Sequence, residues 1–353
     1  MKKPTAILVL AVLLVLCINR HASGVDINVC GKLKDNPDTN ASVDAVAFSP
    51  DGTLLASANN VIVGLSPWVS KRSGQGGTSK GAVILWDVAT KKKLDAIDCG
   101  GRVSGICISP TGKWLAATHL DDQGIQKVKV VELANRKERY SLSIDDKGLR
   151  SVSSTIFSPD GKKLLLGVTG PKFAELMIYD SESGKLQNTL KGGEANISCL
   201  SFSADGKLLT SISEDVVQIW DMTTEKERNS FSVGRGLLTA MSPDGATVAV
   251  ATIGSRNYPG KFALTLHDAK TGKELIDFSQ IRSAAALLFT PDRKYVISGP
   301  GGFIIIYDIT TGKKLAVVDC PSYSGLAITS KGNMLATANY TGTVWLWEID
   351  ASK

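Results

Sequence analysis

The chain has 353 residues, of which 43% are apolar and 21% charged, a balance that is typical of folded globular proteins and excludes a disordered chain. The formal net charge of +6 is mild and acidic and basic residues are interspersed, so charge gives no reason to expect nucleic-acid binding. A chain of this length can form one unit when it is built from repeats or closes into a β structure.

The first 24 residues have the features of a secretory signal peptide. Lys2 and Lys3 give a basic start, Ile7–Ile18 is an uninterrupted apolar run of twelve residues, and small residues end the segment at Gly24. Twelve apolar residues are short for a bilayer span, which needs about 20. We therefore expect cleavage after Gly24 and a secreted or periplasmic protein with no stable membrane span. An uncleaved membrane anchor is the alternative.

A short phrase that predicts a tight turn occurs seven times along the rest of the chain. Its Ser, Pro, Asp and Gly residues suit the four successive positions of a turn, and apolar β-prone residues flank it on both sides. The phrase therefore joins two antiparallel strands. The copies are 48–52, 108–112, 157–161, 202–206, 241–245, 289–293 and 328–332.

A second phrase, an apolar residue followed by an aromatic or aliphatic residue and then an acid, also occurs seven times. It ends a third strand, and in most copies a turn and a fourth strand follow. The copies are Leu85–Asp87, Val130–Glu132, Ile178–Asp180, Ile219–Asp221, Leu266–Asp268, Ile306–Asp308 and Leu346–Glu348. Successive copies are 40 to 48 residues apart, so each unit consists of four short strands.

Two phrases repeated seven times in constant order resemble the WD-repeat (WD40) family of β-propellers. The resemblance covers nearly the whole chain after Gly24 and implies one all-β domain, residues 25–353, with seven four-stranded antiparallel blades. The Gly-His pair of the family is absent throughout. The resemblance therefore implies that the family's His–Ser–Trp–Asp hydrogen-bond network is missing or partial, and that apolar packing holds the blades together.

The strand count predicts how the ring closes. There are seven first, second and third strands but only six fourth strands, because the chain ends soon after the last acidic phrase. The segment Val25–Leu33 alternates well enough to be a strand. We expect it to complete the seventh blade, since an unclosed ring would leave exposed sheet edges.

Insertions concentrate in loops on one face of the predicted ring, where second strands lead to third strands and each outer strand leads to the next inner strand. Long loops on a rigid scaffold commonly carry function. The candidate binding residues in these loops are Trp68 and Arg72 in the loop 59–81, and Arg256 and Tyr258 in the loop 253–262.

Arginines recur where the chain enters the inner strands, and we expect them to surround the channel mouth on the same face. They are Arg102, Arg150, Arg235 and Arg282. Guanidinium groups suit carboxylate or phosphate recognition, which favours an anionic group or an acidic loop of a partner protein. Solvated arginines with local partners are the alternative.

The predicted channel wall offers little chemistry. Among the 42 residues of the seven innermost segments, Asp44 is the one charged side chain, so no catalytic or metal-binding residues are assigned and no cofactor is expected. His267 replaces an aromatic residue of the second phrase. His119 ends a second strand beside Asp121 and Asp122 and is expected in a solvated loop, with a weak metal site as the alternative. A disulfide among Cys30, Cys99 and Cys320 would suit an oxidising compartment, but spacing does not assign one.

The sequence thus favours a monomeric, non-catalytic protein-interaction platform of a secreted bacterial type, with protein partners that it does not identify. The alternative is a propeller that binds a small ligand or glycan, or a loop-based enzyme such as a lactonase-like hydrolase. Ligand-induced thermal stabilisation would favour the alternative, whereas a stoichiometric partner would favour the platform.

Overall fold

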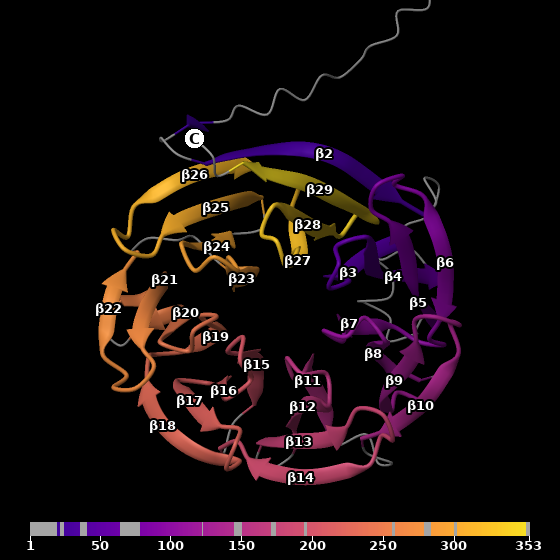
Figure 1. The fold of residues 1–353 in the computed structure, drawn as a ribbon, viewed down its shortest axis with the longest axis horizontal. Coiled ribbons are helices and arrows are strands. Elements are labelled where there is room, and N and C mark those ends of the chain that lie inside the picture. Colours follow the sequence, from indigo (N-terminus) through magenta and orange to yellow (C-terminus); the bar gives the residue numbers. More distant parts are fainter. Residues whose placement is uncertain are drawn as a thin grey trace, which may run out of the picture.

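The computed structural model describes residues 20–21, 25–35, 41–63, 78–121, 123–144, 150–170, 174–193, 196–255, 258–278, 284–299 and 302–350. These residues form seven antiparallel sheets arranged around a central channel, which is the predicted seven-bladed β-propeller (Figure 1). No helix occurs within the ranges just given. The same ranges accordingly contain no apolar helix of membrane-spanning length.

The first six blades each use four consecutive strands, ordered from the channel outward. Blade 1 consists of β3 (Ala41–Phe48), β4 (Leu54–Val63), β5 (Thr78–Asp87) and β6 (Lys93–Asp98). Blade 2 consists of β7 (Val103–Ile108), β8 (Trp114–Leu120), β9 (Gln126–Glu132) and β10 (Glu138–Ser143). Blade 3 consists of β11 (Ser151–Phe157), β12 (Lys163–Thr169), β13 (Ala174–Asp180) and β14 (Leu186–Lys191).

Blades 4 to 6 repeat this arrangement, and blade 6 carries one additional strand. Blade 4 consists of β15 (Ile197–Phe202), β16 (Leu208–Ser213), β17 (Val216–Asp221) and β18 (Lys226–Ser232). Blade 5 consists of β19 (Gly236–Met241), β20 (Thr247–Ser255), β21 (Tyr258–Asp268) and β22 (Glu274–Asp277). Blade 6 consists of β23 (Ala286–Phe289), β24 (Tyr295–Gly299), β25 (Phe303–Asp308) and β26 (Lys314–Asp319), with β1 (Arg20–His21) beside β26.

Blade 7 joins the two ends of the propeller. Its inner strands are β27 (Tyr323–Ile328), β28 (Met334–Asn339) and β29 (Thr343–Asp350), and its outer strand is β2 (Asp26–Lys34), which pairs antiparallel with β29. In Figure 1 the indigo β2 lies outside the yellow β29. The predicted closure of the ring by the segment after Gly24 is therefore confirmed, with bounds one residue later than expected.

The seven predicted turns share one hydrogen-bonded geometry. In the first, the Ser49 amide donates to the Leu54 carbonyl at 2.8 Å, and the Gly52 amide donates to the Ser49 carbonyl at 2.9 Å. The last residue of each turn has a positive φ, which favours glycine. Arg293, with φ of 64°, occupies this position in blade 6.

Apolar contacts between neighbouring sheets form the core. Leu85 of blade 1 and Leu115 of blade 2, for example, are fully buried in a single cluster. The indole-to-hydroxyl part of the expected hydrogen-bond network is present in three blades, so the network is partial, as predicted. The pairs are Trp86–Ser57 at 2.8 Å, Trp220–Ser211 at 2.9 Å and Trp347–Thr337 at 3.1 Å.

The five cysteines that the structure describes contribute apolar volume rather than cross-links. Cys30 and Cys99 are free thiols, so no disulfide forms among Cys30, Cys99 and Cys320. Burial raises the pKa of Cys99 to about 11 and that of Cys107 to about 12. Both therefore remain protonated at neutral pH and are poor nucleophiles.

Candidate functional site at the channel mouth

The two ends of the channel differ in construction. Because the strands of each blade are antiparallel, the repeated turns gather on one face, and the loops between second and third strands gather on the other. On this loop-rich face, the hairpin of β4 and β5 extends as far as the pairing of Val63 with Thr78, well beyond the neighbouring hairpins. The loop-rich face is the one on which sequence analysis placed the binding residues.

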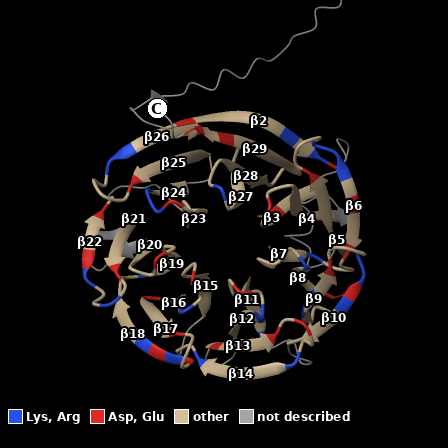
Figure 2. Ribbon diagram, in the orientation of Figure 1, with Lys and Arg blue, Asp and Glu red and all other residues tan. Residues whose placement is uncertain are grey.

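A β-bulge lies near this mouth in the inner strands. Strand pairing shifts by one residue at the same point in six of the seven inner strands, which leaves one residue out of the ladder. The six bulge residues are Asp44, Ser104, Ser153, Ser198, Leu237 and Ser324. Four serines and one aspartate therefore mark a polar ring on strands that are otherwise largely uncharged (Figure 2).

The backbone beside the bulges is held by the preceding blade. Within the described residues, hydrogen bonds of this kind occur at five interfaces between blades and link blades 7, 1, 2, 3, 4 and 5 along the mouth. They are Asn60 with the amide and carbonyl of Val103, both at 2.8 Å; the Val152 amide with Gln126; Ser153 with the Ile197 carbonyl; the Gly236 amide with the Glu214 carbonyl at 2.5 Å; and Ser324 with the Val43 carbonyl at 2.6 Å.

Asp44 has four hydrogen-bond donors around its carboxylate. Arg102 donates to Oδ2 through Nη2 at 2.7 Å and through Nε at 3.1 Å. Asn60 donates to the same oxygen at 3.1 Å, and Ser42 donates to Oδ1 at 2.9 Å. The charge of the one acidic residue in the predicted channel wall is thus balanced across the interface between blades 1 and 2.

The predicted arginines lie at the entrances of their inner strands, but their environments differ. Arg102 is paired with Asp44, and Arg150 is paired with Glu175 of the same blade. Arg235 is exposed and forms no ion pair with any residue in the described ranges. Arg282 lies outside the described residues. Of the three placed arginines, Arg235 alone therefore offers an unneutralised guanidinium.

The loop candidates are only partly placed. Trp68, Arg72 and Arg256 lie outside the described residues, and Tyr258 begins β21 with a side chain that is not described. Their role in binding stays a prediction.

Exposed apolar side chains on the loop-rich face were missed in the sequence analysis. Tyr340, between β28 and β29, is 60% exposed, whereas Phe303 at the start of β25 and Leu120 at the end of β8 are each 38% exposed. Tyr340 and Phe303 belong to neighbouring blades. The sequence did contain a signal for Tyr340, because a bulky aromatic residue at the tip of a tight turn is not required for packing and so indicates a binding surface.

The two histidines are packed into the sheets. His267 stacks on Phe231 and bonds to Thr265 at 2.9 Å, and burial lowers its pKa. The expectation that His119 is solvated is wrong, because β8 continues to Leu120 and leaves His119 only 4% exposed. Burial lowers the pKa of His119 as well.

In the part of the chain that the structure describes, no group of three His, Cys, Asp or Glu side chains lies close enough together to hold a metal ion. The described part of the loop-rich face instead combines bulge hydroxyls, neutralised ion pairs, the unpaired guanidinium of Arg235 and exposed aromatic groups. Groups of these kinds are suited to hydrogen bonding, charge pairing and aromatic stacking.

Comparison with known proteins identifies repeats of the predicted type. Residues 29–87 and 184–221 match the WD40 family, described as the WD domain, G-beta repeat. The first matched segment includes the second half of the closing strand β2 and the strands β3 to β5 of blade 1, and the second includes the outer strand β14 of blade 3 and the strands β15 to β17 of blade 4. Two segments of the chain are thus similar to WD40 repeats, in agreement with the resemblance of its sequence.

Similar proteins include several with such repeats. The chain is 25% identical over 202 residues to pre-mRNA-processing factor 19 homolog 2 of Arabidopsis thaliana, which covers 57% of this chain and 37% of that protein. It is 30% identical over 127 residues to small ribosomal subunit protein RACK1 of Glycine max, covering 36% and 31%. It is 23% identical over 211 residues to serine-threonine kinase receptor-associated protein of Gallus gallus, covering 57% and 56%. The match spans less than two thirds of each relative.

Proposed function

We propose that this chain is a non-catalytic protein-interaction platform that works in the periplasm or outside the cell and binds partners at the channel mouth of its loop-rich face. The observation that carries the proposal is the construction of that mouth. Bonds between blades hold its backbone, and the same face exposes the guanidinium of Arg235 and the aromatic side chains of Tyr340 and Phe303. Rigid frameworks with aromatic and arginine anchors are favourable for protein recognition, because little ordering entropy is lost on binding.

Similarity to proteins with the same repeats supports this function. Serine-threonine kinase receptor-associated protein is, by its name, a protein that associates with a receptor. A fold alone is weak support for a function, since one fold serves many activities. The site residues therefore carry most of the argument.

Export rests on residues 1–24, which serve as a cleavable signal peptide of bacterial type. Cleavage after Gly24 leaves the closing strand intact, because β2 begins at Asp26. All seven four-stranded blades then lie within residues 25–353, the mature domain. Mass spectrometry of the protein from an envelope fraction tests this point, and a mature form that begins elsewhere than Val25 contradicts it.

The partner surface centres on Arg235, Tyr340 and Phe303, with an acidic group of the partner meeting Arg235. Arg102 and Arg150 serve the framework instead, since their charges are already neutralised by Asp44 and Glu175. Trp68, Arg72, Arg256, Tyr258 and Arg282 extend this surface through the loops. The protein acts as a monomer, because the ring closes within one chain.

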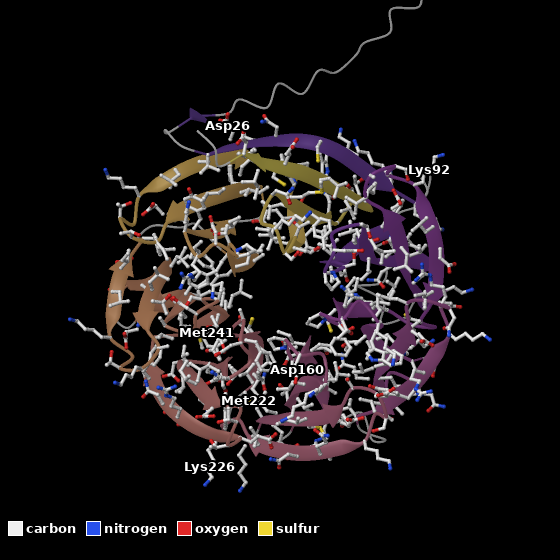
Figure 3. All side chains as sticks on the ribbon, in the orientation of Figure 1. Asp26, Lys92, Asp160, Met222, Lys226 and Met241 are labelled. Carbon is white, nitrogen blue, oxygen red and sulfur yellow. The ribbon has the colours of Figure 1, made fainter. Side chains whose placement is uncertain are left out.

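Affinity capture from envelope and secreted fractions tests the platform. The bait is compared with a double variant, Arg235→Glu with Tyr340→Ser, which alters the mouth but leaves the ion pairs intact. The matched control is Lys92→Glu with Leu94→Ser, whose exposed side chains lie at the perimeter of blade 1; Figure 3 shows Lys92 pointing away from the ring. Loss of a partner with the first variant only supports the proposal. Loss with both, or with neither, contradicts the assignment of the face.

The bulge serines support a second candidate, a small polar ligand such as a glycan. Ser104, Ser153 and Ser198 are exposed on inner strands and so present hydroxyl groups to the channel. A thermal-shift screen with sugars and acidic metabolites separates this function from the platform. Stabilisation that disappears on Ser104→Ala and Ser198→Ala substitution favours the ligand.

A further inference from the structure

Blade 6 differs from the other six blades by an additional strand at its outer edge. Arg20 pairs with Val317 and His21 with Ala316, in antiparallel register. Within the described residues, the other sheets have four strands each. In Figure 1 a short indigo arrow, β1, lies outside β26. An outer strand of this propeller thus accepts a further strand.

The composition of β26 suits that role. Between its terminal Lys314 and Asp319, the strand contains only the apolar residues Leu315–Val318. Among the other outer strands of six or more residues, each has a charged or polar side chain within its length. Natural sheets protect open edges with charges or by covering them, and β26 lacks the first kind of protection.

The start of the closing strand already lies on β26. Val25 and Ile27 are buried in one cluster with Ala316 and Val318, so the start of the closing strand packs against blade 6 while it pairs with β29 in blade 7. Val25 therefore lies close to β26, and β1, which ends four residues earlier in the chain, pairs with the edge of that strand.

We propose that β26 is a strand-acceptor edge and that the segment just before the closing strand, placed here as β1, is its occupant. The chain fastens blade 6 with β1 and then closes blade 7 with β2. Cleavage after Gly24, which belongs to the proposed function, removes this occupant. Export thereby uncovers on blade 6 an edge that can take an extended segment.

Hydrogen exchange tests the pairing directly. Four proteins are compared. The first is the full chain in mild detergent, and the second is the processed chain 25–353, which keeps every four-stranded blade. The third is the full chain with Arg20→Pro and His21→Pro, which removes two amide donors, and the fourth is the full chain with Arg20→Lys and His21→Gln, which keeps them. We expect outward-facing amides of β26 to exchange about tenfold faster in the second and third proteins than in the first and fourth. Amides of β6 in blade 1 should exchange equally in all four. Equal exchange of β26 in all four proteins overturns the proposal, whether or not the signal peptide is cleaved.

Cross-linking identifies the occupant. Directly opposite residues of an antiparallel pair have Cβ atoms about 4.5–5.5 Å apart, so a small local adjustment brings them within the range of about 3.5–4.5 Å that a disulfide needs. A full chain with Arg20→Cys and Val317→Cys, and with Cys17→Ser to remove a competing thiol, should form this bond within one chain. The control pair Arg20→Cys and Ala96→Cys, on the outer strand of blade 1, should not. A bond between two chains assigns the edge to a second copy and overturns the proposal, as does equal cross-linking of both pairs.

Discussion

Asp44 and Arg102 form an ion pair across the interface between blades 1 and 2, with Nη2 of the guanidinium 2.7 Å from Oδ2 of the carboxylate. The side chain of Asp44 is only 10% exposed, whereas that of Arg102 is 57% exposed. The pair therefore joins a mostly buried carboxylate to a largely solvated guanidinium. It contributes to stability by compensating the charge of the buried Asp44 carboxylate.

Removal of the base is expected to destabilise the protein. Arg102→Ala leaves a mostly buried carboxylate with only Asn60 and Ser42 as donors. The expected loss in free energy of unfolding is about 1–2 kcal/mol, above the value of a fully exposed pair. Urea denaturation measures it, with Arg235→Ala as the control, because Arg235 has no such partner in the described ranges. Equal effects of the two substitutions would show that the pair contributes nothing.

The indole-to-hydroxyl bonds lead to a second prediction. Ser211→Ala leaves the buried Nε1 of Trp220 without its acceptor at 2.9 Å. An unsatisfied buried donor costs about 1–3 kcal/mol, so the free energy of unfolding should fall by that amount. Ser230→Ala, at an exposed position of β18, should change it by less than about 0.5 kcal/mol. A Ser211→Ala protein as stable as the Ser230→Ala protein contradicts the assignment.

The architecture was predictable because its signals are local and repeated. Each turn needs particular residues at fixed positions, and seven copies reveal blade number and strand order. Closure by β2 followed from counting, since Val25–Leu33 was the remaining segment able to act as an outer strand. The fifth strand of blade 6 did not follow, because two residues carry no pattern.

The site was less predictable, because charge balance depends on contacts between distant residues. Sequence analysis identified both Asp44 and Arg102 but not their pairing, since they are 58 residues apart. The bulge serines share one position in each inner strand, but a bulge is a property of strand register, which spacing alone does not reveal. The burial of His119 depended likewise on how far β8 extends.

A third prediction concerns the left-handed turn residue of blade 6. Arg293 has φ of 64°, whereas the other six turns have glycine at this position. Arg293→Gly removes backbone strain of about 1–2 kcal/mol but also an exposed ion pair with Asp244, worth about 0–1 kcal/mol, and adds flexibility to the unfolded chain. We expect a net change within about 1 kcal/mol that becomes more favourable to the variant in high salt, where the ion pair is screened.

Thermal unfolding at two salt concentrations measures this balance. The converse substitution, Gly245→Ala in the blade 5 turn, provides the control, because its φ of 71° disfavours a side chain. It should destabilise the protein at both salt concentrations. A salt-independent difference between Arg293 and Arg293→Gly would show that the ion pair with Asp244 is not formed in solution.

A fourth prediction concerns acid. Burial lowers the pKa of His119 and of His267 in the folded protein, so each contributes stability that is present above its unfolded pKa of about 6.5 and is lost as the pH falls through the folded value. Turn aspartates act in the same direction at lower pH. Hydrogen bonds from Ser49 and Thr53 lower the pKa of Asp51, for example, so its contribution is lost below an unfolded value of about 3.9.

The free energy of unfolding should therefore fall in two stages on acidification, one beginning near pH 6.5 and one below about pH 4. His267→Phe, which fills a position held by Trp or Tyr in five other blades, should weaken the first stage and leave the second unchanged. Asp51→Asn should do the reverse, because an amide does not titrate. Urea denaturation between pH 3 and pH 8 distinguishes these outcomes. A first stage that is undiminished in a protein with both His119→Gln and His267→Phe would mean that other groups cause it.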